Sequence, residues 1–146
     1  MEKILVGVTP ENDRLWAGIH ALSLAKRIKA QVTFLLILEP LKGREKAGQR
    51  KEAELSVRKS LESIIDQARS EGVHVEYYMA RGSYEGELVR FVKENKMSML
   101  IIDSPACEKG VAGSAKDTLE KIRHQIDCRV EVVQRKSSDL ECKRRR

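Results

Sequence analysis

The sequence predicts a single α/β domain built on an open, parallel β-sheet. Apolar segments alternate along the chain with segments of helical periodicity, in the order β-α-β-α-β-α-β-α-β. Each connection between strands is long enough for a helix, and such crossovers are almost always right-handed. We therefore expect a three-layer, Rossmann-like open sandwich with five parallel strands and helices on both faces. A chain of 146 residues fits one such domain with its own core.

The first part of the chain predicts two buried strands separated by a helix. Lys3–Val8 and Gln31–Leu38 are nearly continuous apolar runs, which is typical of strands covered on both faces. The segment between them predicts an amphipathic helix that ends near Ala30, and Glu11 and Asp13 suit its first turn. The apolar face of this helix is expected to carry Leu15, Ile19, Leu22 and Ile28.

A polar loop over residues 41–49 leads to a second predicted helix, from about Lys51 to Ser70. Gly72 follows this helix as its expected left-handed cap. Val73–Met79 is the third strand, and its alternation of apolar and polar residues predicts an edge position. The apolar face of the second helix carries Val57, Leu61, Ile64, Ile65 and Ala68.

The last part of the chain predicts two more helix–strand pairs. Gly82 turns the chain into a third helix, which ends near Asn95 and is followed by the strand Ser98–Ile102. Arg129–Gln134 is a short, alternating strand that we expect at the other edge of the sheet. A fourth helix precedes it, with an apolar stripe of Ala115, Leu119, Ile122 and Ile126. We expect the domain to span residues 1–136 and residues 137–146 to form a disordered basic tail.

The composition predicts a soluble, cytoplasmic protein. No apolar run approaches the roughly 18–20 residues of a membrane span, and the first residues lead directly into a strand without a signal peptide. Cys107, Cys128 and Cys142 have no spacing typical of a metal site, so we expect free thiols, a reducing compartment and no bound metal.

Basic residues are concentrated in two places, within a net charge of +6. They lie in the linker Lys42–Lys51 and in the tail Lys143–Arg146. Such patches attract nucleic acid or an anionic membrane surface. No aromatic residues alternate with them, so a solvated loop and a solubilising tail are the preferred interpretation, and nucleic acid is not expected as a partner.

The strongest functional indication is the segment Leu100–Ser114, LIIDSPACEKGVAGS. In an open parallel sheet, ligands bind at the carboxyl ends of the strands where the strand order reverses, and we expect that reversal between the first and fourth strands. Gly113 and Ser114 begin the fourth helix, whose N-terminus offers free N–H groups to a phosphate. Ser114 is equally explained as a helix cap. The candidate binding residues are Thr9, Leu38, Asp103, Ser104, Gly113 and Ser114.

This pattern resembles the universal stress protein family over about residues 2–135. The resemblance rests on the order of elements, on KILVGV at the start, on Gly82 after the third strand and on the Gly-Ser pair that begins the last helix. It implies nucleotide-binding relatives in which an Asp ends the first strand. In those relatives the fourth strand leads into G-x-x-G, nine residues and then G-S/T. It also implies ATP as their ligand, with the Asp near the adenosine and the glycines around the phosphates.

Most of that pattern is changed in this chain. The Asp position falls on Thr9, the first glycine on Asp103 and the second on Ala106. Six residues, 107–112, replace the nine of the spacer, and only Gly113-Ser114 remains. Pro105 has no N–H to offer a phosphate, and an acid at position 103 repels one. A bound Mg²⁺ would reverse that repulsion, and an Asx turn before Pro105 explains the same acid without a ligand.

We therefore predict a universal-stress-type regulatory or binding module without tight ATP binding, without an enzymatic role and without a cofactor. The alternative is a nucleotide-binding stress protein with a rearranged phosphate loop and slow hydrolysis. A third option is a binder of nucleic acid or anionic surfaces through the basic linker and tail. The resemblance also implies a homodimer joined by antiparallel pairing of the strand Arg129–Gln134, with Arg129 and Glu131 forming ion pairs across it. Trp16 is either a partial core residue or an interface anchor, and the three histidines are expected at the surface.

Overall fold

The computed structural model describes residues 2–10, 15–39, 47–103 and 120–133. Five parallel strands form one sheet in the order β3-β2-β1-β4-β5. Because β1 lies between β2 and β4, the strand order reverses between β1 and β4, which confirms the predicted topology. The strands are β1 (Lys3–Val8), β2 (Gln31–Leu38), β3 (Val75–Arg81), β4 (Met99–Asp103) and β5 (Arg129–Val133).

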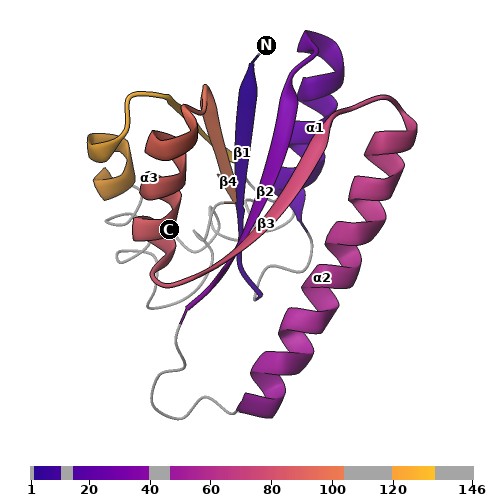
Figure 1. Cartoon of the computed structure of the whole chain (residues 1–146), viewed down its shortest axis with the longest axis vertical. Coiled ribbons are helices and arrows are strands. Elements are labelled where there is room, and N and C mark those ends of the chain that lie inside the picture. The colour runs from indigo at the N-terminus through magenta and orange to yellow at the C-terminus, as the bar shows by residue number, and fades with distance from the viewer. Residues whose placement is uncertain (1, 11–14, 40–46, 104–119, 134–146) are drawn as a thin grey trace, which may run out of the picture.

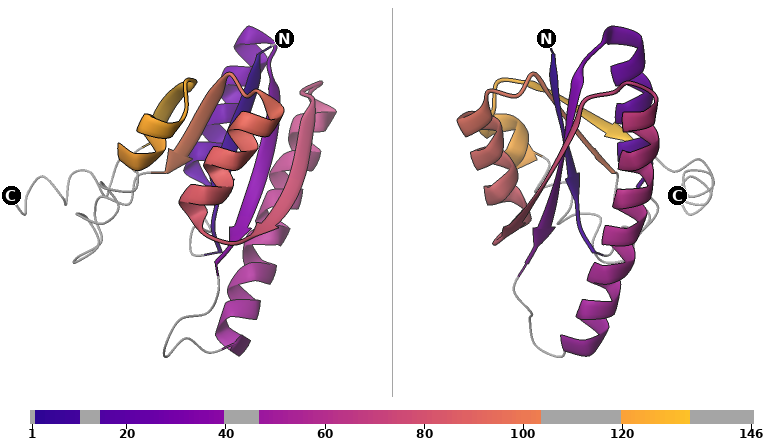
Figure 2. Two further views of the ribbon diagram at one scale, coloured as in Figure 1. Left: turned by 60° about the vertical axis from the view of Figure 1, so that its left-hand side comes forward. Right: turned by 45° about the vertical axis from the view of Figure 1, so that its right-hand side comes forward.

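Helices cover both faces of this sheet, as the crossovers predicted. The helices α1 (Trp16–Ile28) and α2 (Ala47–Ser70) pack on one face, and α3 (Tyr84–Asn95) packs on the other (Figure 1). Residues 120–125 are helical and lie on the same face as α3. The turned views in Figure 2 show the same three layers, with the carboxyl ends of β1 and β2 at one edge of the domain.

The two central strands supply both cores because their side chains alternate between the faces. Ile4, Val6 and Phe34 are fully buried under α1 and α2. Leu5 and Ile37 are fully buried on the other face, against α3 and residues 122–126. This two-sided burial explains why β1 and β2 read as continuous apolar runs.

The predicted apolar face of α1 is wrong in part. Ile19 and Ile28 are 49% and 43% exposed. The residues that face the sheet are mostly small, namely Ala17, Gly18, Ala21, Leu22 and Ala25. A Cβ atom on Gly18 would lie 2.7 Å from Cε1 of Phe34, so the helix axis is too close to the sheet for a large side chain there. Helix packing distance, rather than apolar spacing, therefore decides which face is buried.

Several boundaries also differ from the prediction. α1 begins at Trp16 and has no acidic residue in its first turn, and Glu11 and Asp13 lie outside the described residues. α2 begins at Ala47, so Arg50 and Lys51 belong to a helix and not to a linker. β3 begins two residues later than expected but does lie at an edge. The predicted cap is confirmed, because Gly72, two residues after the end of α2, has φ +89°.

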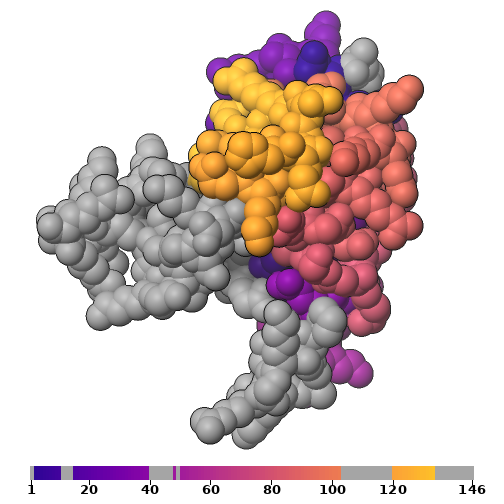
Figure 3. Space-filling view, turned by 90° about the vertical axis from the view of Figure 1, so that its left-hand side faces the viewer, coloured from indigo at the N-terminus to yellow at the C-terminus, as the bar shows by residue number. Residues whose placement is uncertain are grey.

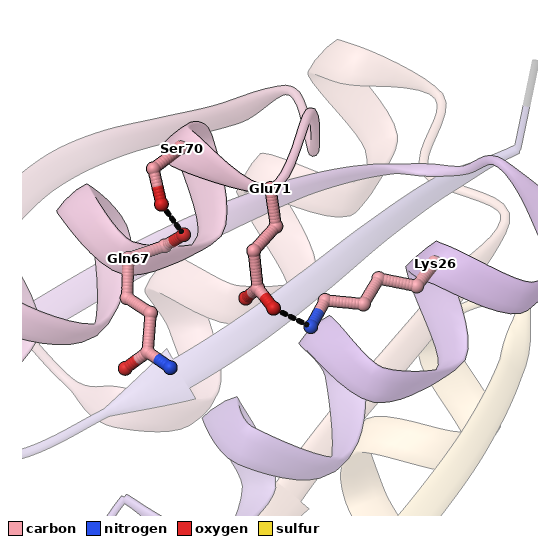
Figure 4. Close-up of polar contacts among 4 residues, drawn as sticks. All are labelled: Lys26, Gln67, Ser70 and Glu71. Carbon is pink, nitrogen blue, oxygen red and sulfur yellow. Dashed lines mark hydrogen bonds and ion pairs between the residues drawn. The ribbon is translucent and has the colours of Figure 1, made fainter.

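An ion pair joins the C-terminal ends of α1 and α2. The Lys26 Nζ atom lies 2.6 Å from Oε2 of Glu71, the residue after α2 (Figure 4). In the last turn of α2, the Ser70 hydroxyl donates to the carbonyl of Gln67 at 2.6 Å. Both charged side chains are 42% exposed, so the pair orients the helix ends and contributes little to stability. No helix in the described part of the chain is both long enough and apolar enough to span a membrane.

We expect the substitution Gly18→Val to destabilise the domain by about 2 kcal/mol, because its added atoms overlap the buried Phe34 ring. The matched control is Gly48→Val in α2, where an added Cβ meets nothing within 4 Å. That control should leave stability unchanged or slightly raised. Urea unfolding of both variants measures the difference, and equal midpoints would contradict this account of α1.

Candidate functional site

The predicted ligand position is the carboxyl edge of the sheet, where β1 and β4 end side by side. Thr9 and Pro10 follow β1; Thr9 is half-buried and Pro10 is buried. Asp103 ends β4, two residues after Ile101, which pairs with Val6 of β1. Thr9 and Asp103 therefore come from neighbouring strands at the point where the strand order reverses. Ser104, Gly113 and Ser114 lie outside the described residues, so their roles stay predictions.

Leu38 is engaged by the fold on both its side chain and its backbone. Its side chain is 4% exposed and belongs to the core under α1 and α2. Its carbonyl accepts a hydrogen bond from the N–H of Gly82 at 3.1 Å. Gly82 has φ +148°, a conformation that favours glycine, so this turn after β3 fixes the end of β2. The role of Leu38 at this edge is therefore structural, since its side chain packs in the core and its carbonyl is bonded to Gly82.

Glu39, the residue directly after β2, connects three elements at this edge. Its Oε2 atom accepts the backbone N–H of Tyr84, the first residue of α3, at 3.3 Å. Its carbonyl accepts a hydrogen bond from Nη2 of Arg50 in α2 at 2.9 Å. The end of β2 is thereby joined to the starts of α2 and α3. The only signal in the sequence is an acid placed directly after a buried strand.

Tyr84 is a polar residue that the sequence analysis did not select. Its hydroxyl would lie 3.1 Å from a Cβ atom on Gly7 of β1, and Cδ2 of Leu88 would lie 2.8 Å from the same atom. Glycine at position 7 thus lets the Tyr84 ring cross β1 on the α3 face of the sheet. A phenol hydroxyl therefore lies next to β1, near the residues that precede Thr9.

The N-terminus of α3 has its own hydrogen-bond acceptors. The Ser83 hydroxyl accepts the N–H of Gly86 at 3.1 Å, and Glu39 accepts that of Tyr84. Glu85 and Glu87 add negative charge to the first turn. Two of the first N–H groups of the helix therefore have acceptors, and the nearby acids oppose an incoming anion.

The described residues with displaced pKa values lie away from this edge. Burial raises the pKa of the Tyr77 hydroxyl under α2, and the nearby Arg58 partly opposes the shift. Burial also raises the pKa of the Cys128 thiol, so this cysteine is protonated at neutral pH and a poor nucleophile. Within the described ranges, no group of three His, Cys, Asp or Glu side chains could hold a metal ion.

One histidine differs from the expected surface position. His20 on α1 is half-buried, and its Nε2 atom lies 3.3 Å from Oε1 of Glu131 on β5. His74 and His124 are exposed, as expected. The His20–Glu131 contact joins residues 111 positions apart, so no local pattern in the sequence announces it.

Comparison with known protein families shows to which family this chain belongs. A model of the universal stress protein family matches residues 1–134 of the 146. The chain belongs to the universal stress protein family. By sequence, this universal stress protein matches none of the curated proteins.

Solved structures of other family members share the fold. A universal stress protein in complex with cAMP superposes with a TM-score of 0.67 at 16% identity, covering 90% of this chain and 96% of that one. A family member from Arabidopsis thaliana with AMP bound superposes with a TM-score of 0.60 at 14% sequence identity, and the match covers 95% of each chain. A universal stress protein from Archaeoglobus fulgidus superposes with a TM-score of 0.61 at 20% identity, and the match covers 90% of this chain and 98% of that one. At these identities the similarity shows the shared fold.

We expect Glu39→Ala to lower the free energy of unfolding by about 1 kcal/mol, because the Tyr84 N–H loses its acceptor at the start of α3. Glu39→Gln keeps an oxygen acceptor and removes only the charge, so its loss should be smaller. Urea unfolding of both variants tests the order. An alanine variant as stable as the native protein would show that Glu39 does not hold the edge together.

Proposed function

We propose that this universal stress protein is a dimeric binding module of the cytoplasm that is not an enzyme and does not hold ATP tightly. The observation that supports this most directly is Thr9. The family's nucleotide-binding pattern has an Asp there, and Thr9 follows β1 at the reversal of strand order. The edge therefore lacks the carboxylate that the pattern places near the adenosine.

The charge at the end of β4 supports the same proposal. Asp103 takes the place of a loop glycine and ends the strand next to β1. Like charges repel, so an acid at this position opposes a triphosphate. A nucleotide with fewer phosphates carries less negative charge and is repelled less by Asp103.

A nucleotide with a single phosphate is therefore the second candidate ligand. The structures of two relatives contain cAMP and AMP, and this chain shares their fold over nine-tenths of its length or more. Polar groups also lie at this edge, namely the Glu39 carboxylate after β2 and the Tyr84 hydroxyl next to β1.

The edge strand β5 supports the proposed homodimer. β5 pairs with β4 on one side, and no described strand lies on its other side. Figure 3 shows residues 120–133 in yellow on this side of the molecule. An antiparallel pairing centred on Val130 would place Arg129 opposite Glu131 of the partner subunit, twice about the two-fold axis. Opposite charges facing each other across strands stabilise such a pairing.

Calorimetric titration tests the ligand proposal. We expect no binding of ATP in the micromolar range, with or without Mg²⁺, and stronger binding after Asp103→Gly because a negative charge is lost. Asp127→Gly, which removes an exposed acid just before β5, is the matched control and should change nothing. Micromolar ATP binding by the native protein would overturn the proposal, and binding of AMP or cAMP alone would select the second candidate.

A charge swap tests the dimer. Arg129→Glu should raise the dimer dissociation constant about tenfold or more, because two acids would then face each other across the paired β5 strands. The double variant Arg129→Glu, Glu131→Arg restores opposite charges and should recover the dimer. Sedimentation velocity at micromolar concentration gives the masses. A native protein that is monomeric under these conditions would remove the proposal.

A further inference from the structure

We infer that His20 makes the pairing of two β5 edges sensitive to pH, so that mild acid separates the two copies of the chain. This inference rests on the proposed dimer. The contact that carries it is the one between Nε2 of His20 and Oε1 of Glu131, at 3.3 Å. It connects α1 to the outermost strand of the sheet, directly beside the edge that a second copy would use.

The pair is partly shielded from solvent. The two side chains are 37% and 33% exposed, so solvent screens them only in part. A histidine side chain ordinarily gains its charge between pH 8 and pH 5, whereas an ordinary glutamate stays ionised down to about pH 4.3.

The other groups around His20 make the surroundings basic. On β5, Arg129 shares the face of Glu131, since side chains two positions apart point the same way. On α1, Arg27 lies two turns beyond His20 on the same side of the helix. β4 presents Met99 and Ile101 to this face, and both are buried and apolar. Glu131 is the acid in direct contact with His20.

Antiparallel pairing centred on Val130 brings Arg129 of the partner subunit opposite Glu131. With His20 neutral, the carboxylate of Glu131 is available to that arginine. Protonation gives His20 a positive charge that neutralises Glu131 within its own chain and repels the incoming guanidinium. The attraction between His20 and Glu131 is present in the monomer as well, so it does not favour association. The repulsion exists only in the dimer.

The sign of the pH dependence follows from this difference. Because the added charge is less favourable in the dimer, two separate monomers bind protons more readily than the dimer does. The dimer is then stronger while His20 is neutral, and it weakens once His20 is protonated. Two such repulsions about the two-fold axis correspond to about a tenfold rise in the dissociation constant or more.

Sedimentation velocity of the full chain at pH 8.0, 6.5 and 5.5, at constant ionic strength, tests the inference. We expect the dissociation constant to rise about tenfold or more from pH 8.0 to 5.5 in the native protein. His20→Gln keeps a hydrogen-bond donor to Glu131 and cannot be charged, so its dissociation constant should change little. His74→Gln removes an exposed histidine just before β3, at the opposite edge, and should respond like the native protein.

The possible outcomes separate this inference from the dimer proposal. A native dimer with the same dissociation constant at all three pH values would overturn the role of His20 while the dimer stands. An equal response in the native protein and His20→Gln would do the same, since the titrating group would then lie elsewhere. A native protein that is monomeric at every pH would overturn both. Circular dichroism at each pH verifies that the chains stay folded.

Discussion

The close approach of α1 to the sheet is the constraint on which much of this structure depends. A glycine at position 18 lets the helix lie against the ring of Phe34, the largest fully buried side chain. From that position α1 reaches across the sheet to the last strand, where His20 contacts Glu131. It also reaches α2 on its other side, where Lys26 contacts Glu71. A bulkier residue at position 18 would move the helix and weaken both contacts.

The carboxyl edge shows how this fold can keep its architecture and change its chemistry. The ends of β1 and β4 lie where the topology requires, but the residues there are Thr9 and Asp103. Glu39 meanwhile joins β2, α2 and α3 through hydrogen bonds to Arg50 and Tyr84. The scaffold of the site is therefore held by backbone pairing and one carboxylate, independently of any ligand.

The sequence predicts the strands and their order well because two-sided burial leaves a direct trace, the continuous apolar runs of β1 and β2. It predicts the face of α1 poorly, because apolar spacing identifies Ile19 and Ile28 but not the small residues that close packing requires. The sequence places Glu39 at this edge but does not reveal its contact with Tyr84, because that contact joins residues 45 positions apart. The candidate site could thus be located from topology, whereas its polar groups depend on tertiary contacts that leave no local pattern.

Trp16 connects the packing of α1 to the proposed seam between two copies. The sequence left it open whether this residue belongs to the core or to an interface, and it is 41% exposed. Helical spacing puts it one turn before His20, on the side of α1 that faces β5. A large, partly exposed aromatic side chain beside an open strand edge is typical of an interface anchor. The contact between His20 and Glu131 lies one turn away. In the proposed dimer, apolar burial by Trp16 would supply association energy that does not depend on the charge of His20.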